Sequence, residues 1–384
     1  MIEVEFYCNS KNYKIIKERH NKVQKNRTEC NYSSVEAREL PPENVHTAER
    51  LKELQSLPLN RKIQITQSRI IEWYNYWNGQ VYVSFSGGKD STVLLHIARQ
   101  LFPDIEAVYV DTGLEYPELR EFVKTFDNVT WLKPAMNFRR VIEEYGYPLM
   151  SKDISRDVGR TQKDGGFNSK TGERTWAWKF LNGLVTDKNG NKSHFNKEKW
   201  AYLVNAPFKV SNKCCDIMKK NPAHKYAKSS NKKSITGMMT IESTQRKMQW
   251  LKVGCNAFDN KNPQSNPMSF WTEQDVLEYC INNKIQLCSV YGNIVKDDKG
   301  KWRTTGLDRS GCVYCGFGCH LEKSPNRFER LKITHPKIWD YCIRPKDKGG
   351  LGMGEVLDFI NVPYGKEECD ECNSRDCQSN DYRK

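Results

Sequence analysis

The chain has 384 residues, which is long enough for a large core and for two subdomains. It carries 61 Lys and Arg residues against 47 Asp and Glu, a formal charge of +14 at pH 7, which favours an anionic partner such as a nucleotide, a sulfonucleotide or a nucleic acid. No apolar run is long enough to span a bilayer and the N-terminus lacks a signal-peptide pattern, so we expect a soluble, cytoplasmic protein with no membrane partner.

The first readable pattern follows an N-terminal extension, residues 1–60, that carries no motif. Apolar and aromatic residues recur at helical intervals from residue 63 to residue 77, which predicts an amphipathic helix. Residues 81–85 are β-branched or aromatic and predict a buried strand. We therefore place the start of the folded domain, residues 61–320, at this helix.

A glycine-bearing turn separates the strand from a helix that opens with Val93, Leu94 and Leu95. The turn reads Ser86, Gly87, Gly88, Lys89, Asp90 and Ser91. Glycines let backbone N–H groups approach an anion, and the N-terminus of the following helix favours a phosphate that Lys89 can neutralise. Asp90 would repel a phosphate, so we expect it to cap the helix or to hold a metal ion such as Mg²⁺ that the phosphates share. A serine-capped glycine turn is the simpler alternative.

A second polar segment follows the next strand. Residues 105–110 predict that strand, and residues 119–126 and 129–132 predict a helix and a third strand. Strands that alternate with helices imply right-handed crossovers and a parallel sheet, in which ligands bind at the carboxyl ends of the strands. The glycine turn and the second segment both fall at that edge. The second segment reads Asp111, Thr112 and Gly113.

A basic and aromatic region comes next. Lys152 and Arg156 could grip a phosphate of a sulfonucleotide or a nucleic acid, and an ordinary solvated face explains them equally well. Residues 162–210 are rich in Gly, Asn, Lys and Trp and predict an inserted flap with a hairpin turn at 187–191. Trp176, Trp178 and Lys179 could stack on a nucleic acid or pack the flap itself.

The cysteines form the second constellation. The chain has 14, which in a reducing compartment favours metal, catalytic or buried roles over disulfides. Cys214 and Cys215 are adjacent, and Cys312-x-x-Cys315 lies about a hundred residues later. A Cys-x-x-Cys suits zinc or an iron–sulfur cluster, and the adjacent pair favours a [4Fe–4S] cluster because zinc sites usually space their ligands by two to four residues. Structural zinc and scattered buried thiols remain alternatives.

These motifs resemble one superfamily. The glycine turn looks like the pyrophosphate-binding loop of the adenine-nucleotide α-hydrolases, and the cysteine pattern resembles the cluster-bearing branch of the phosphoadenylyl-sulfate (PAPS) reductase family. Residues 234–246 resemble the family strand that ends in Gly-x-Arg, although Met239 stands where the family has the arginine. Thr272 and Asp275 match a Trp-Thr-x-x-Asp-Val helix start and have the spacing of a capping box.

The resemblance implies an α/β fold with a doubly wound, mostly parallel sheet and a cysteine-bearing C-terminal part of helical and irregular structure, with residues 321–384 forming a helical segment and a Cys-rich tail. It implies that the metal ligands are Cys214, Cys215, Cys312 and Cys315, with Cys319 as a substitute ligand or a redox nucleophile. Lys89, Asp90 and Cys319 are the catalytic candidates. The nucleotide-binding candidates are Ser84, Phe85, Ser86, Gly87, Gly88, Lys89, Asp90, Ser91, Asp111, Thr112, Gly113, Gly237, Glu242 and Arg246.

The function implied is an enzyme that binds ATP, adenylyl-sulfate or PAPS on the glycine turn and performs sulfur chemistry beside the cluster. The reaction is either reduction of a sulfonucleotide or ATP-dependent sulfur transfer, with a thiol or a protein as the sulfur or electron donor. The acceptor in the second case could be a tRNA or DNA. A zinc-stapled, basic nucleic-acid-binding protein is the alternative from another class. The tail cysteines Cys369, Cys372 and Cys377 could form a second metal site, a resolving dithiol or a solvated tail, since they lack the family's C-terminal nucleophile signature.

Overall fold

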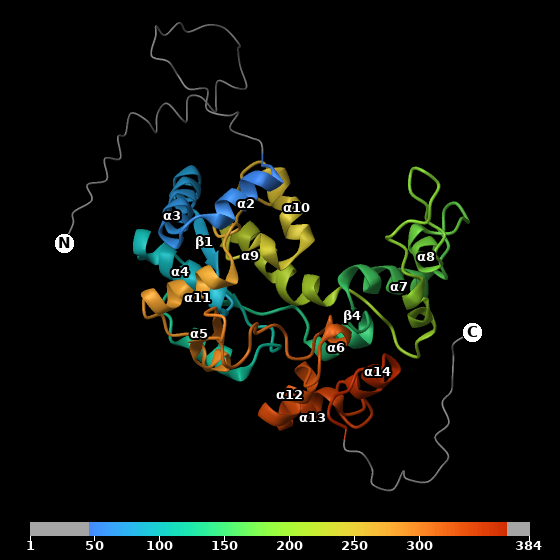
Figure 1. Ribbon diagram of the computed structural model, residues 1–384. Helices are drawn as coiled ribbons and strands as arrows, with labels where there is room; N and C mark the ends of the chain where they lie inside the picture. Colours follow the sequence, from blue (N-terminus) through green and yellow to red (C-terminus); the bar gives the residue numbers. More distant parts are fainter. Residues whose placement is uncertain (1–45, 367–384) are drawn as a thin grey trace, which may run out of the picture. The chain divides into compact units, whose positions relative to one another are not determined.

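The computed structural model describes residues 46–366 (Figure 1). The predictions about residues 1–45 and about Cys369, Cys372 and Cys377 lie outside these residues. Across residues 46–366, no helix combines the length and the apolar character that a membrane crossing requires.

A six-stranded sheet with the order β3-β2-β1-β5-β7-β6 forms the centre. Every neighbouring pair is parallel except β6 and β7, which are antiparallel. The first three strands follow one another toward one edge of the sheet, and β5 lies on the other side of β1. The strand order therefore reverses between β1 and β5. Ligands bind in sheets of this kind at such a reversal. The strands are β1 (Val81–Ser84), β2 (Ala107–Val110), β3 (Val129–Leu132), β5 (Lys233–Thr236), β6 (Asn256–Ala257) and β7 (Gln264–Ser265).

Helices cover both faces of this sheet, because alternate residues of β1 contact different helices. Val81 and Val83 belong to a core formed with α3 (Leu59–Tyr76), α4 (Lys89–Leu101) and α11 (Glu273–Asn282). Tyr82 points to the opposite face, where its ring lies 5.4 Å from that of Tyr226 on α9 (Asn221–Ser230). The prediction of an α/β, doubly wound, mostly parallel sheet is therefore confirmed. Figure 1 shows α3, α4 and α11 as neighbours.

A second apolar core holds the cysteine-bearing part of the chain. It is built from α6 (Phe138–Glu144), β4 (Leu149–Met150), α7 (Lys152–Asp164) and the C-terminal helices. The short strand β10 (Gly316–Phe317) pairs in parallel with β4, so the segment that follows Cys315 is fixed to this core. The C-terminal helices are α12 (Arg327–Thr334), α13 (Pro336–Ile343) and α14 (Met353–Phe359).

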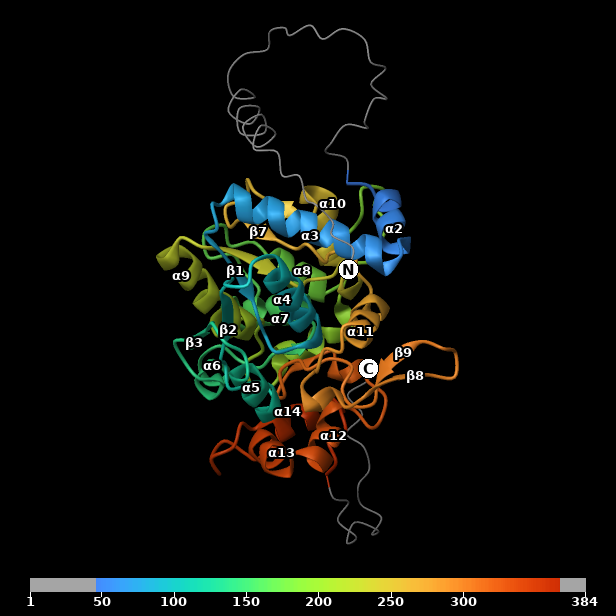
Figure 2. The same ribbon diagram turned by 90° about the vertical axis from the view of Figure 1, so that its left-hand side faces the viewer.

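The remaining elements connect these layers. They are α2 (Ala48–Ser56), α5 (Pro117–Lys124), α8 (Trp176–Leu181), η1 (Glu198–Asn205), η2 (Asp216–Lys220), η3 (Thr240–Glu242), α10 (Thr244–Val253), η4 (Ser289–Tyr291), β8 (Ile294–Lys296), β9 (Trp302–Thr304) and η5 (Cys319–Leu321). Figure 2 shows β8 and β9 as a projecting hairpin. The capping box of Thr272 and Asp275 is present at the start of α11. The hairpin turn at 187–191 is confirmed, since Thr186 and Lys192 form an antiparallel bridge across it.

Candidate functional site

The glycine turn connects β1 to α4, as predicted, and it lies where the strand order reverses. Gly87 has a φ of +73°, and a Cβ there would lie 2.8 Å from Val123 on α5, so both the backbone conformation and the packing require glycine. Gly88 is the N-cap of α4 and makes no side-chain cap. The N-terminus of a helix favours an anion. The Ser91 hydroxyl closes the turn by accepting a hydrogen bond from the backbone N–H of Ser86 at 3.1 Å.

Lys89 is almost fully buried and contacts residues from α11 and from the segment that follows it. Its ammonium group donates to the backbone carbonyl of Asp308 and lies 3.1 Å from Oε1 of Glu273, and its backbone N–H donates to the Tyr291 hydroxyl at 3.3 Å. Segment 289–310 therefore lies against the glycine turn. A phosphate that bound here would compete with Glu273 and the Asp308 carbonyl for the same ammonium group.

Asp90 does not cap α4, which corrects one of its two predicted roles: the cap is Gly88, and Asp90 lies within the first turn. Its Oδ1 atom is buried and has no hydrogen-bond partner among residues 46–366. Burial raises the pKa of this carboxyl group, against the opposing effect of Lys89, Arg309 and Arg246. A buried carboxylate oxygen without a partner is the kind of atom that a cation could satisfy.

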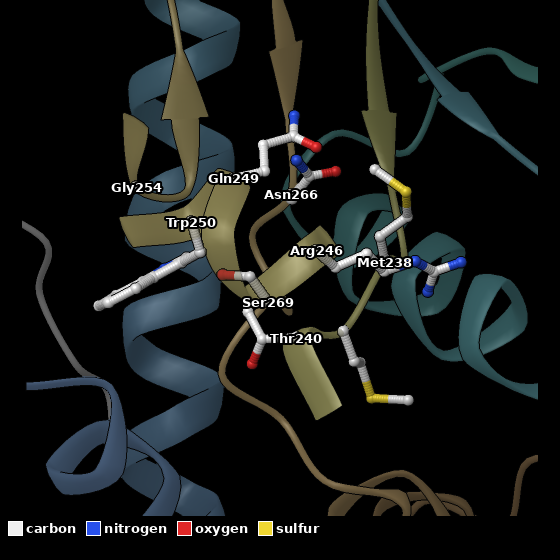
Figure 3. Close-up of a pocket in the computed structure, with 9 residues that line it drawn as sticks. Met238, Thr240, Arg246, Gln249, Trp250, Gly254, Asn266 and Ser269 are labelled. Atoms are coloured by element: carbon white, nitrogen blue, oxygen red, sulfur yellow. The ribbon is translucent and has the colours of Figure 1, made fainter. Parts of the chain in front are cut away.

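The segment after β5 forms the second wall. A Cβ on Gly237 would lie 3.1 Å from the backbone oxygen of Asp90, so the two loops are in close contact. Glu242 binds Arg246 and also accepts from Arg309 at 3.1 Å. Arg246 also lines a small pocket with Met238, Trp250 and neighbouring residues (Figure 3). Burial and Arg309 lower the pKa of Arg246, so an incoming anion would relieve the repulsion between these two cations.

The segment after β2 completes this edge. Asp111 accepts from Arg120 at 2.8 Å, and the Thr112 hydroxyl donates to Glu115 at 2.8 Å. Gly113 has a φ of +70°, and a Cβ there would meet nothing within 4 Å, so its backbone borders open space. The predicted residues 111–113 therefore lie at the same edge of the sheet as the glycine turn.

Two of the predicted nucleotide-binding residues, Ser84 and Phe85, belong to the end of β1 and its continuation. Ser84 ends β1, while the Phe85 side chain is buried in the core and packs against Phe126 with the ring centroids 4.8 Å apart. Phe85 can therefore contribute to a ligand only through its backbone. Met239 is also buried, so the departure from the family's arginine leaves an apolar side chain at that point.

The two pairs of cysteines predicted as metal ligands lie far apart in the sequence, and the fold brings them within electrostatic range of one another. The thiols of Cys214 and Cys215 are 3.9 Å apart, and Cys214 interacts electrostatically with Cys312 and Cys315 as well. The segment that precedes the second pair contacts the glycine turn: the Ser310 hydroxyl would lie 3.5 Å from a Cβ on Gly88. Cys312 follows Ser310 by two residues, so their Cα atoms are within about 7 Å. The Val313 N–H donates to the Leu114 carbonyl at 2.8 Å, which links this pair to the segment after β2.

Cations surround the thiols. The hydrogen bond from the Cys214 thiol lowers the pKa of Cys215, and Lys152, Lys219 and Lys220 lower it further. The same hydrogen bond and burial raise the pKa of Cys214. Lys219 lies 3.3 Å from Glu115 and contacts Cys312; although burial opposes its charge, these two groups raise its pKa.

Four thiols with neighbouring cations suit a soft metal centre, because thiolates bind iron–sulfur clusters and zinc, and cations offset the charge of the thiolates. Within residues 46–366, however, no three His, Cys, Asp or Glu side chains are arranged as a formed metal-binding group. The donor set thus fits such a centre in its chemistry, and the thiols would have to close around it.

Cys319 belongs to the same apolar core as Cys214. Its thiol is buried, donates to the Gly316 carbonyl at 3.1 Å and has its pKa raised to about 11 by burial. Such a thiol lacks the exposure and the low pKa of a redox nucleophile, so we assign no catalysis to it. Its role as a substitute ligand remains a prediction. The neighbouring His320 contacts Trp200, with the ring centroids 5.0 Å apart.

Of the two basic candidates on α7, only one is close to the thiols. Lys152 acts on Cys215, whereas Arg156 pairs with Asp153 at 2.5 Å and with Asp157 at 2.9 Å. Sequence reasoning missed Lys219, Glu115, Tyr291, Glu273 and Arg309. Glu273 stands only at a variable position of the Trp-Thr-x-x-Asp-Val motif, and the Lys219-Lys220 pair directly behind the adjacent cysteines offered the clearest signal.

Comparisons with known proteins agree with these motifs. A family model described as the phosphoadenosine phosphosulfate reductase domain matches residues 80–149 and 179–319, more than half of the chain. One uncharacterised protein of Methanocaldococcus jannaschii is 40% identical over 76 residues, 18% of each chain. Another from the same organism is 22% identical over 268 residues, 68% of this chain and 40% of that protein. The chain thus spans less than half the length of these curated relatives.

The solved structures that are similar include a phosphoadenylyl-sulfate (PAPS) reductase from Candida auris in a phosphate complex. The TM-score is 0.33 at 12% identity, over 66% of this chain and 97% of that one.

Proposed function

Since the chain belongs to the phosphoadenosine phosphosulfate reductase family, we propose that it is an enzyme that seats the phosphates of an adenine nucleotide on Ser86–Ser91 and performs sulfur chemistry at the neighbouring cysteines. The observation that carries this proposal is the meeting of the two sites through Ser310, which lies against Gly88 and precedes Cys312 by two residues.

The glycine turn supplies the recognition of phosphate. The N-terminus of α4, the hydroxyls of Ser86 and Ser91 and the ammonium group of Lys89 all favour a polyanion there. Asp90 would offer its unpartnered oxygen to a Mg²⁺ ion shared with the phosphates. Arg246 and Arg309 lie beside this carboxylate and would stabilise charge on the phosphates.

Cys214, Cys215, Cys312 and Cys315 would hold a [4Fe–4S] cluster. Such a cluster, when bound, would supply a redox-active or sulfur-polarising centre beside the nucleotide. The residues of this chain would set its surroundings: Lys219 and Lys152 offset the charge of the thiolates, and pairing of β10 with β4 fixes the segment after Cys315.

Two reactions fit this arrangement and differ in the bond that is broken. In reduction of a sulfonucleotide, a thiolate forms a bond to the sulfonate sulfur while the sulfur–oxygen bond to the nucleotide breaks. A second thiol then releases sulfite and leaves a disulfide, which an external thiol donor reduces again. In ATP-dependent sulfur transfer, an oxygen of the acceptor attacks the α-phosphate and pyrophosphate leaves. A sulfur nucleophile of the donor then bonds to the acceptor carbon while the carbon–oxygen bond breaks and AMP leaves. The complete motif from Ser86 to Ser91 favours a pyrophosphate-bearing ligand such as ATP, whereas the cysteine pattern favours reduction.

Product analysis separates these outcomes. Anaerobically purified protein is incubated with labelled ATP, adenylyl-sulfate or PAPS, each with and without a dithiol. AMP and pyrophosphate from ATP indicate adenylylation of an acceptor, and sulfite from a sulfonucleotide indicates reduction. The proposal is contradicted if none of the three nucleotides binds or turns over.

Metal analysis separates the proposal from a zinc-stapled nucleic-acid-binding protein. We expect iron and labile sulfide in the anaerobic protein. Zinc without either, together with the lack of nucleotide binding, would favour the other class.

A further inference from the structure

The flap carries an unusual surface that the nucleotide site does not use. Several of its aromatic side chains are exposed: Trp176 is 66% exposed, Phe195 62% and Phe167 45%. Large aromatic side chains are normally buried, so several exposed rings on one insertion indicate a binding surface. Phe167 and Trp176 lie between residues 149 and 179, which the family model does not match.

Cations accompany these rings. The guanidinium of Arg174 lies 3.7 Å from the ring centroid of Phe167 and 4.1 Å from that of Trp178. The ammonium group of Lys179 lies 5.3 Å from the Trp176 ring, and that of Lys199 lies 4.6 Å from the Trp200 ring. Between residues 165 and 200 the chain has seven Lys or Arg and three Asp or Glu residues. The surface is therefore both aromatic and basic.

A hollow of about 460 Å³ lies in the same insertion, with Trp200 in its lining. It is lined by residues of the 192–200 segment, among them Lys197, Lys199 and Trp200. The Lys197 N–H donates to the Phe180 carbonyl at 2.8 Å, which joins the hollow to α8. Glu198, the acid in its lining, is paired with Lys192. Trp200 also contacts His320 of the cysteine segment, so an occupant of the hollow would lie next to that segment.

We infer that this flap surface, formed by Phe167, Arg174, Trp176, Lys179, Phe195 and Lys199, binds single-stranded nucleic acid. Unpaired bases stack on exposed aromatic rings, and lysine and arginine side chains neutralise the backbone phosphates. In a duplex the base faces are already stacked, so the exposed rings favour an unpaired strand. An acidic protein would use the cations and would have no use for several exposed rings. The inference concerns binding alone and holds whichever reaction takes place at the cysteines.

The test is fluorescence anisotropy of a labelled single-stranded oligonucleotide with the full chain and no nucleotide added. Trp176→Ala and Phe195→Ala should each weaken binding about tenfold, because stacking on one ring is typically worth a factor of that order. Both side chains are exposed, so the unfolding midpoints should stay unchanged and show that the variants are folded. Lys179→Ala should weaken binding less and should reduce the dependence on salt.

Matched controls lie away from the flap. Ile333 on α12 is 77% exposed, and Ile333→Ala should leave binding unchanged, as should Lys299→Ala in the β8–β9 turn. The inference is overturned if the oligonucleotide does not bind, if a duplex binds as tightly as the single strand, or if Trp176→Ala and Ile333→Ala behave alike. Binding of poly-glutamate in place of the oligonucleotide would also overturn it. Because no nucleotide is present, failure here leaves the proposed function standing, and failure of nucleotide turnover leaves this inference standing.

Discussion

The glycine turn and the cysteine group are the two halves of the candidate site, and they differ in how the fold builds them. The turn is contiguous in sequence, with Gly87 in the left-handed region and Gly88 at the start of α4. The cysteines arrive from two distant segments and lie together without forming a metal-binding group. On the proposed function, the chain itself would preorganise the phosphate site, whereas a metal centre would complete the thiol site.

The largest expected effect is the loss of iron when one of the four proposed cysteine ligands is replaced. Cys312→Ser should strongly lower the brown colour, the iron and the labile sulfide of the anaerobic protein, because it removes one of the four proposed thiolate ligands. Cys342→Ala is the matched control, since this buried cysteine belongs to the second core. Iron and sulfide assays on both variants give the answer. Retention of iron in Cys312→Ser, or its loss only from Cys342→Ala, would contradict the proposed ligand set.

The next effect concerns the charge on the glycine turn. Lys89→Ala removes a buried ammonium group from the phosphate site and should lower nucleotide turnover by about a hundredfold or more, as is typical when a preorganised electrostatic contact is lost. Lys124→Ala on α5, whose side chain is exposed and pairs with Glu121, should leave turnover unchanged. Turnover rates of both variants and of the wild type are measured at saturating nucleotide. Equal rates for Lys89→Ala and the wild type would remove the turn from the mechanism.

Two glycines allow the preorganisation of the turn to be tested directly. Gly87 and Gly113 both have a positive φ, so alanine should cost about 1–2 kcal/mol of backbone strain at either position. Only at Gly87 would the new Cβ also collide with Val123, which should add about 1–3 kcal/mol and weaken nucleotide binding about tenfold. Denaturant unfolding and nucleotide titration measure both quantities. If Gly113→Ala is the more damaging change, the conformation assigned to the turn is wrong.

The smallest expected effect is a gain in nucleotide affinity, whereas the other substitutions cause a loss. Glu273 is half exposed and shares the ammonium group of Lys89 with the Asp308 carbonyl. Glu273→Gln would release a pair worth about 1 kcal/mol at most, so nucleotide affinity should rise by up to about fivefold. Glu278→Gln on the same helix is the control and should have no effect. Weaker nucleotide binding by Glu273→Gln would show that this carboxylate assists the nucleotide instead of competing with it.

The same contrast explains how much the sequence could reveal. The strand at 81–85, the turn and the capping box of Thr272 and Asp275 depend on neighbouring residues, and each was predicted before the fold was known. The contacts of Lys89 with Tyr291 and of Lys219 with Glu115 join residues far apart in the sequence. No local pattern encodes such contacts, because they depend on how the layers pack.

Cys319 illustrates the other limit of sequence reasoning. Its position four residues after Cys315 made it a candidate ligand or nucleophile. Packing decides otherwise for the nucleophile, since the thiol faces the second core and donates to a backbone carbonyl. Spacing alone could not show on which side of the turn this sulfur would lie.

The most direct test of the whole account is an anaerobic crystal structure with an adenine nucleotide, with anomalous scattering recorded across the iron absorption edge. We predict phosphates bound by the backbone of Ser86–Ser91 and an iron signal enclosed by Cys214, Cys215, Cys312 and Cys315. Phosphates bound elsewhere, or a lone zinc signal in place of iron, would contradict it.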